Sequence, residues 1–316
     1  MKKTSVVKRL LASLLLTSLL MAGCDKDDDP VPTPSPKTIA EIVSGDTSFS
    51  FLLAAAVKAG LDGALSGTSP LTVFAPTNNA FRAAGYATAA SVSAEDASTL
   101  SSILLYHILD GTVEASDVPA GPNASVTTKG GLAVYATSNS SGVFINGVKV
   151  TAADITASNG VIHVIGSVLI PPSGNIVETA VATPDFSYLV AAVLRASTGT
   201  TDVAAALSGP GPLTVFAPTN QAFITAGFAT IDDINLADPD DLAAILTYHV
   251  IAARVFSSDL TNGLQPATLN GGTVTINLGT GATVTGAGNA TASNITATNI
   301  VATNGVIHVI DQVLLP

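Results

Sequence analysis

Histidine has the most adaptable chemistry of the side chains in this sequence, and the chain contains four histidines. His107 and His163 lie 56 positions apart in the first half, and His249 and His308 lie 59 apart in the second. Neither pair has the accompanying cysteines or the i,i+4 histidine partner that are usual in zinc sites. We therefore predict that the protein binds no metal ion.

Carboxylates are the next candidates for chemistry, because a pair of them can act as acid and base. No such pair recurs between the two halves of the sequence; Asp117 and Asp259 recur singly, in Ser-Asp-Val and Ser-Asp-Leu, where capping a turn is the more ordinary role. The sequence also has no G-x-S-x-G motif and no phosphate-binding glycine loop. We predict no catalytic residue, no cofactor and no enzyme activity; an enzyme or a small-molecule binder would require a deep polar pocket.

The elements that carry these residues occur twice. Residues 71–81 read L-T-V-F-A-P-T-N-N-A-F, and residues 213–223 repeat them with a single change, from Asn79 to Gln221. The pattern predicts a strand that ends at a proline and a helix that a threonine caps. Two nearly identical segments 142 positions apart indicate a duplicated domain. We expect the phenylalanines of both copies to lie in the cores: Phe74, Phe81, Phe216 and Phe223.

An amphipathic helix precedes each of these segments. Asp46 or Ser48 can cap the first helix and Gly60 can end it, whereas Thr183 and Pro184 open the second. Their predicted buried stripes share an i, i+3, i+4, i+7, i+8 spacing: Phe49, Leu52, Leu53, Ala56 and Val57 in the first copy, and Phe186, Leu189, Val190, Val193 and Leu194 in the second.

A second helix in each copy ends in Tyr-His. The first should begin with a capping box at Ser93, and the second should begin at Asp238 and Pro239. The histidines His107 and His249 fall on the apolar stripe. An unpaired polar group in that position costs about 1–3 kcal/mol, so a buried, hydrogen-bonded histidine is favoured over an exposed functional one.

Strands follow in each copy. We expect them at 132–137 and 143–150 in the first copy and at 273–278 and 282–285 in the second. Both copies then close on N-G-V-I-H-V-I, at 159–165 and 304–310, where Asn-Gly should form a turn with positive φ. Helices followed by strands predict an α+β fold with a mainly antiparallel sheet.

Together, the T-V-F-A-P-T-N-x-A-F segment, the helical Tyr-His and the terminal N-G-V-I-H-V-I resemble the fasciclin domain, in order and in both copies. The resemblance implies two tandem fasciclin-like domains, at 38–172 and 174–316. Each would be a twisted, mainly antiparallel β-wedge packed with a bundle of helices. Members of that family are secreted or surface-anchored, and most of them act in cell–cell and cell–matrix adhesion.

The resemblance also implies candidate partner-binding residues. In animal members of the family, integrin contact is attributed to the Tyr-His segment and to an Asp-Ile dipeptide just before the terminal motif. The matching residues here are Tyr106, His107, Asp154 and Ile155 in the first domain, and Tyr248, His249, Asn299 and Ile300 in the second. Asn299 lacks the carboxylate, so acidic recognition would be retained in the first domain alone.

The N-terminus reads as a targeting segment. A basic region and a short apolar run end in M-A-G-C, which resembles a bacterial lipoprotein signal at 1–23 with lipidation of Cys24, the one cysteine of the chain. The alternative is an ordinary signal peptide with an incidental cysteine. Residues 24–37 form an acidic, proline-rich linker. It is either a spacer with an export tag like that of bacterial surface lipoproteins, or a linker whose charge aids solubility.

The charge balance excludes one class of partner. Charged residues make up 11% of the chain, against about 25% in an average globular protein. Four of the 12 basic residues and none of the 23 acidic ones precede Cys24, so the remainder carries 8 basic against 23 acidic side chains. Nucleic acid requires the opposite sign.

These observations predict an adhesion or binding protein of the cell envelope. We expect a lipid anchor in the outer membrane, exposure at the cell surface, and a protein or polysaccharide ligand on matrix or neighbouring cells. The alternative is a structural or stress-related scaffold that binds another envelope component.

Overall fold

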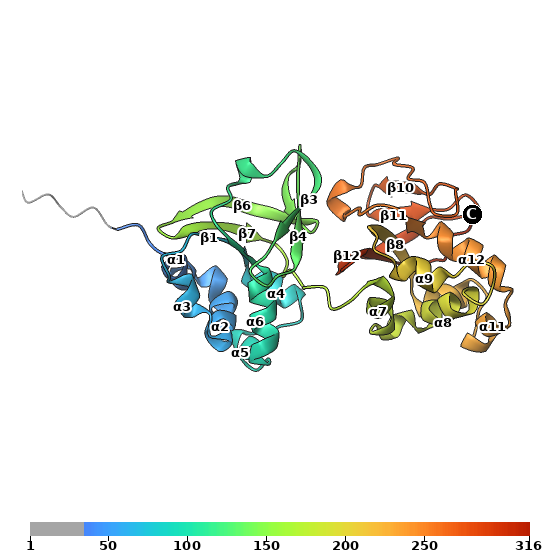
Figure 1. The fold of residues 1–316 in the computed structure, drawn as a ribbon, viewed down its shortest axis with the longest axis horizontal. Helices are drawn as coiled ribbons and strands as arrows, with labels where there is room; N and C mark the ends of the chain where they lie inside the picture. Colours follow the sequence, from blue (N-terminus) through green and yellow to red (C-terminus); the bar gives the residue numbers. More distant parts are fainter. Residues whose placement is uncertain (1–34) are drawn as a thin grey trace, which may run out of the picture. The chain divides into compact units, whose positions relative to one another are not determined.

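The computed structural model describes residues 35–316, which contain two repeats of one α+β architecture (Figure 1). The predicted signal peptide and most of the predicted linker lie outside these residues. The first repeat begins with the helical elements α1 (Ile39–Gly45), η1 (Thr47–Phe49), α2 (Ser50–Ala59) and α3 (Asp62–Leu65). After strand β1 (Leu71–Pro76) it continues with α4 (Asn78–Ala83), α5 (Ala89–Ser93) and α6 (Ala97–Tyr106).

The remainder of the first repeat is mostly strand. It comprises β2 (Ile108–Asp110), the short helix η2 (Ala115–Asp117), β3 (Gly121–Thr127), β4 (Ala133–Asn139), β5 (Gly142–Ile145), β6 (Val148–Ala157) and β7 (Gly160–Ile165). The sheet order is β2-β1-β7-β6-β5-β4-β3. All neighbours are antiparallel except β1 and β7, which run parallel with Phe74 opposite His163. The predicted α+β fold with a mainly antiparallel sheet is confirmed.

The second repeat follows the same plan with fewer strands. Its helical elements are α7 (Ile176–Val181), η3 (Pro184–Phe186), α8 (Ser187–Ala196), α9 (Val203–Ser208), α10 (Asn220–Thr225), α11 (Ile231–Leu236), α12 (Pro239–Tyr248) and η4 (Ser257–Asp259). Its strands are β8 (Leu213–Pro218), β9 (Val250–Ile251), β10 (Thr275–Leu278), β11 (Ala282–Thr285), β12 (Ser293–Ala302) and β13 (Gly305–Ile310), in the order β10-β11-β12-β13-β8-β9. Here β8 and β13 form the parallel pair.

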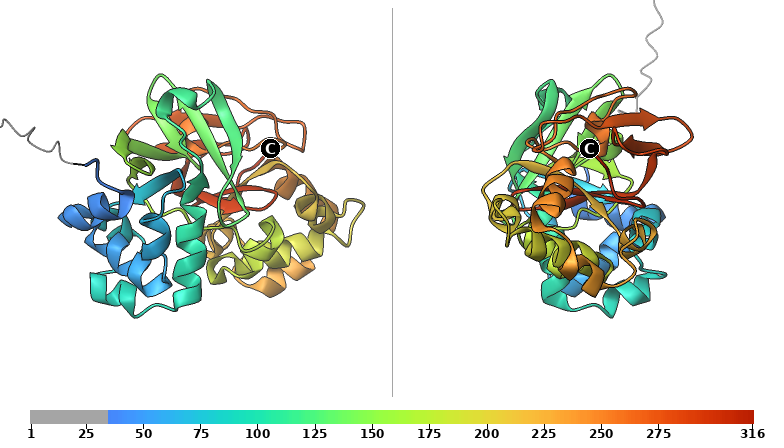
Figure 2. Two further views of the ribbon diagram at one scale, coloured as in Figure 1. Left: turned by 60° about the vertical axis from the view of Figure 1, so that its left-hand side comes forward. Right: turned by 90° about the vertical axis from the view of Figure 1, so that its right-hand side faces the viewer.

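Each repeat has two apolar clusters, one on either side of its first strand. In the first repeat Val73 joins the cluster beneath the helices, whereas its neighbour Phe74 faces the cluster inside the β-wedge. Figure 2 shows the helices of each repeat gathered on one side of its sheet. All four predicted core phenylalanines are buried, and burial of each stabilises the fold by about 1.5–3 kcal/mol.

Local signals set several boundaries as expected. The hydroxyls of Thr77 and Thr219 cap α4 and α10 by accepting hydrogen bonds from the amides of Ala80 and Ala222. The next residue, Asn78, ties α4 to the start of α2, because its side chain accepts a hydrogen bond from the Phe51 amide at 3.0 Å and donates one to the Thr47 carbonyl at 2.8 Å. Asp46 caps η1, Gly60 ends α2 in a left-handed conformation, and Asp238 caps α12.

Four local predictions are wrong. Asp96 caps α6 by accepting from two backbone amides, whereas the predicted capping residue Ser93 ends α5. Residues 143–150 form two strands, because Asn146, with φ of 50°, makes a tight turn between β5 and β6. The predicted stripes are rotated, so Val57 and Leu194 are exposed. Pro184 opens η3, but the Thr183 side chain makes no capping bond.

The Asn-Gly of the closing motif has a different role from the one predicted. The turn lies one residue earlier, and Gly160 already pairs with Ala157 as the first residue of β7. Glycine is required there because φ is 141° and a Cβ would collide with the Leu71 carbonyl. Asn159 is buried, and its side chain accepts from the Ile39 amide at 2.9 Å while donating to the carbonyls of Leu65 (2.9 Å) and Gly67 (2.7 Å).

Asn304 repeats this clamp in the second repeat. Its side chain accepts from the Ile176 amide at 2.9 Å and donates to the carbonyls of Leu207 (2.9 Å) and Gly209 (2.7 Å). One buried amide therefore holds the first helix and the chain that leads into the first strand against the last hairpin.

Replacing this amide should destabilise the fold. We expect Asn304→Ala to lower the free energy of unfolding by about 3 kcal/mol, because three buried backbone groups lose their partner. Urea unfolding followed by circular dichroism measures the change. Asn277→Ala, at an exposed position of β10, is the matched control and should change it by less than about 0.5 kcal/mol. A loss of less than about 1 kcal/mol in Asn304→Ala would contradict the clamp.

Candidate functional site

The two Tyr-His pairs lie at the ends of α6 and α12, with all four side chains buried. Nδ1 of His107 lies 2.8 Å from the Ile103 carbonyl, and its Nε2 accepts a hydrogen bond from the Leu169 amide at 2.9 Å. His249 makes the same two bonds, to the Ile245 carbonyl and from the Leu314 amide, both at 2.8 Å. Each ring therefore joins its helix to the segment that follows the closing strand.

These bonds require a neutral imidazole. Nδ1 carries the proton that is donated to the helix carbonyl, so Nε2 must stay unprotonated to accept from the amide. Burial lowers the pKa of both His107 and His249 to about 4, because no counter-charge compensates for the lost hydration.

The tyrosines fasten the same helix ends to the wedge. The Tyr106 hydroxyl donates to the Ala133 carbonyl at 2.9 Å and accepts from Nδ2 of Asn146 at 3.0 Å. Burial raises the pKa of Tyr106 to about 12. The Tyr248 hydroxyl donates to the Thr273 carbonyl and accepts from the Ala287 amide at 2.9 Å.

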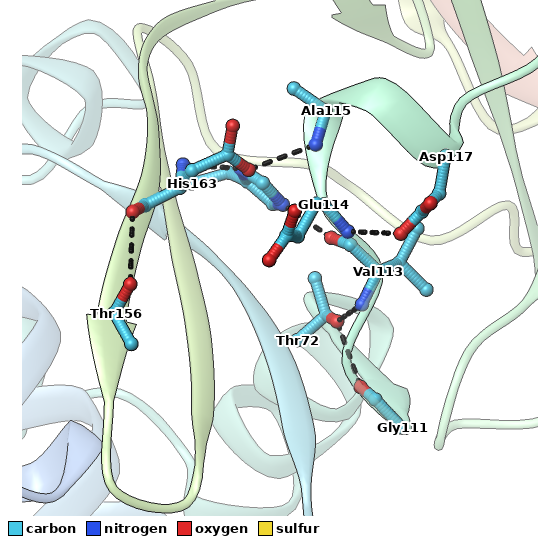
Figure 3. A network of polar contacts seen from close by, with 9 residues as sticks. Thr72, Gly111, Val113, Glu114, Ala115, Asp117, Thr156 and His163 are labelled. Carbon is cyan, nitrogen blue, oxygen red and sulfur yellow. Dashed lines mark hydrogen bonds and ion pairs between the residues drawn. The ribbon is translucent and has the colours of Figure 1, made fainter.

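The Asp-Ile dipeptide lies on a β-bulge. The register of β6 against β7 shifts just before Ile155, and Asp154 takes a left-handed conformation with φ of 58°. Its Oδ1 accepts from the Ala115 amide at 2.8 Å, which fixes the η2 turn against the sheet. The Asp154 amide donates to Nδ1 of His163 at 3.3 Å, while Nε2 of His163 lies 2.8 Å from the Val113 carbonyl (Figure 3).

The second repeat has the equivalent bulge in β12, with an asparagine in place of the aspartate. Asn299 has φ of 64°, and its Oδ1 accepts from the Ser257 amide at 2.8 Å. Asp and Asn are the non-glycine residues that best tolerate this conformation, so the backbone is the same in both repeats although the charge differs. Nδ2 of Asn299 also donates to Oγ of Ser257 at 2.7 Å, a bond that a carboxylate cannot donate. The repeats also differ at the histidine: Nδ1 of His308 is buried and has no hydrogen-bond partner within residues 35–316, whereas both ring nitrogens of His163 have one.

The candidate residues differ in how far their side chains are exposed to solvent. The Tyr-His side chains are at most 1% exposed, so a partner of the folded protein does not reach them. The Asp154 side chain is 44% exposed. Ile155 and Ile300 are half-buried and pack against the helical clusters of their repeats. Cys24 lies outside the described residues.

The recurring carboxylates are turn caps. Oδ2 of Asp117 accepts from the Glu114 amide at 2.9 Å, and Oδ2 of Asp259 accepts from the Phe256 amide at 2.8 Å. Within residues 35–316 no group of three or more His, Cys, Asp or Glu side chains is placed to hold a metal ion. In the same range no single helix is both long and apolar enough to span a membrane. Helix α1 and the helical segment Thr47–Ala59 reach that length and apolar character only when they are taken together, and they are bent by 98° relative to each other.

The sequence matches the family model described as "Fasciclin domain" at residues 47–171 and again at 184–316. The chain belongs to the fasciclin domain family. The match occurs twice, which confirms the prediction of two tandem fasciclin domains; their limits at 38–172 and 174–316 stay predictions.

Several fasciclin-domain proteins are similar to this chain. Protein sll1483 of Synechocystis sp. is 43% identical over 141 residues, which cover 44% of this chain and 77% of that protein. Transforming growth factor-beta-induced protein ig-h3 of Sus scrofa is 30% identical over 254 residues, 80% of this chain but 35% of that protein. Human periostin is 33% identical over 199 residues, 60% of this chain and 22% of that protein. The matched region is thus a minor part of the two animal proteins.

Among solved structures, a FAS1 domain pair from the insect cell adhesion molecule Fasciclin I is 20% identical. The alignment covers 84% of this chain and 96% of that one, with a TM-score of 0.40.

The buried histidines make a specific prediction for pH dependence. An unfolded histidine has a pKa near 6.5, so below that pH the unfolded chain binds more protons than the folded one. Stability is therefore complete above about pH 6.5 and falls as the pH drops toward 4. We expect each of the two helix-end histidines to contribute a loss of about 2 kcal/mol by pH 5.

Urea unfolding at pH 7.5, 6.5, 5.5 and 5.0 measures this loss. Most Asp and Glu side chains titrate below about pH 4.5, outside the window. The variant His249→Gln should show a shallower fall between pH 6.5 and 5, whatever its stability at pH 7.5. A free energy of unfolding that does not change between pH 7.5 and 5.0 would contradict the neutral buried rings.

Proposed function

We propose that this fasciclin-domain protein is a lipid-anchored binding protein of the cell surface that mediates adhesion. A lipid on Cys24 would hold it at the outer membrane, and its two domains would bind a protein or polysaccharide on matrix or neighbouring cells. Membership of a family whose members mostly act in adhesion is the observation that carries this proposal.

The internal geometry supports a binding role over a chemical one. The residues that both repeats share, Tyr-His and the closing Asn, use their polar atoms for hydrogen bonds within their own repeat. Ligand binding would then depend on the exposed surface of a chain that is rich in Ser and Thr and poor in charged residues. Two modules on one chain raise a weak single-site affinity through avidity when both engage the same ligand.

Asp154 is the best candidate for an acidic contact. Its side chain is nearly half exposed, and the bond to the Ala115 amide uses Oδ1, which leaves Oδ2 without a recorded partner among the described residues. The bulge fixes the direction of the carboxylate, so it is presented in one orientation at little entropic cost.

Adhesion of cells tests the proposal. A deletion strain should attach less than the wild type to immobilised matrix or polysaccharide from the same culture, and the full chain should restore attachment. Cys24→Ser should fail to restore it, because the protein is no longer anchored. Equal attachment of the wild-type and deletion strains would rule out adhesion. Resistance of the protein to protease on intact cells would favour the envelope scaffold instead.

A charge exchange tests the acidic contact. Asp154→Asn should reduce attachment several-fold without unfolding the protein, because Asn299 holds the same φ and the same backbone bond in the second repeat. Asn299→Asp is the matched control and should not reduce attachment. Surface levels are equalised by quantitative immunoblotting. Full attachment by Asp154→Asn at equal surface level would exclude the carboxylate from binding.

A further inference from the structure

The helical side of the second repeat contains an apolar cavity of about 100 Å³ between α7, α8, α9 and the sheet. Its wall consists of Ala, Val, Leu and Ile side chains together with one ring, that of His249. Both nitrogens of this ring are hydrogen-bonded to the backbone, at 2.8 Å each. The lining residues therefore offer a guest no spare hydrogen-bonding group.

The cavity reaches the surface between α7 and α8. Val181 and Leu194 line it, and they are also 64% and 62% exposed. Two large aliphatic side chains thus stand in water at its mouth.

The first repeat shows that the fold does not impose this cavity. The amides of Ile39 and Ile176 bind equivalent asparagines, which fixes the correspondence between α1 and α7. The equivalent space in the first repeat measures about 10 Å³, at most the volume for a single water molecule. The second repeat has Ala180 and Val250 where the first has the larger Val43 and Ile108, and Val181 at the mouth where the first has Ser44; in the opposite sense, Val193 stands where the first repeat has the smaller Ala56.

The size and the charge around the cavity specify its guest. A volume of about 100 Å³ holds roughly three water-sized groups and is smaller than the ~150 Å³ cavity known to bind benzene, so a slender chain fits better than an aromatic ring. From residue 174 onward the sequence has two basic side chains, Arg195 and Arg254, against ten acidic ones. The resulting field disfavours a carboxylate head group.

We propose that this cavity binds the end of an uncharged, unbranched alkyl chain, as in a long-chain alcohol. The terminal methylene groups occupy the space beside Ala180 and Val250. The rest of the chain leaves along Val181 and Leu194. The binding energy comes from removal of apolar surface from water on both partners.

Methyl NMR of the full chain, titrated with 1-octanol, tests the site. We expect 1-octanol to shift the methyl resonances of lining residues such as Val193 and Leu207 and to leave those of the first repeat unchanged. Octanoate at low salt should bind at least tenfold more weakly. The absence of any shift up to the solubility limit of 1-octanol would overturn the proposal, as would equal binding of octanoate.

Exchange of side chains between the repeats supplies matched variants. Ala180→Val with Val250→Ile refills the cavity and should weaken 1-octanol binding at least tenfold without lowering the melting temperature. Val43→Ala with Ile108→Val opens the first repeat and should create a second site there. If the refilled variant does not fold, the test depends on the opened variant. The absence of new 1-octanol-induced methyl shifts in the first repeat of the opened variant would then overturn the proposal. Unchanged affinity in a folded, refilled variant would do the same.

Discussion

The structure of each repeat depends on a neutral histidine that is buried where the last α-helix of the repeat ends, α6 in the first and α12 in the second. Nε2 of His107 accepts a hydrogen bond from the Leu169 amide, and Nδ1 donates one to the Ile103 carbonyl. Leu169 follows the closing strand, so this side chain joins the middle of the repeat to its end. Protonation would place an N–H donor on Nε2 opposite the Leu169 amide, which is itself a donor, in a buried site. The folded structure therefore requires that this ring stays neutral.

Hydrogen bonds of this kind also explain why the three shared motifs, the strand–helix segment, the Tyr-His and the closing strand, occur together in both repeats. β7 and β13 are the last strands in sequence but central strands in space, each paired in parallel with the first strand of its repeat. In both repeats this central strand is held at its start and just after its end. Asn159 and Asn304 fasten its start, and the histidine fastens the segment after it. The shared motifs thus hold the interior of each repeat together.

Divergence between the repeats follows physical limits. At the bulge the left-handed backbone accepts Asp154 or Asn299, so charge changes while geometry does not. Beneath the helices, Val43 and Ala180 alter volume without altering the hydrogen bonds around them. Each difference is a substitution that the scaffold tolerates; the first changes the surface charge and the second changes the interior volume.

The sequence by itself determined the duplication, the fold class and the helix ends at Thr77, Asp238 and Gly60, because these depend on local chemistry: caps, glycine conformations and apolar periodicity. Only the tertiary structure decided the rest. Strands β3 and β12 and the second half of β6 lie outside the predicted strands, because polar residues and β-bulges interrupt the apolar alternation there, and they exist because they pair with neighbours. The Asn159 clamp, the exposure of Asp154 and the cavity depend on contacts between residues far apart in the chain, and local patterns carry no record of such contacts.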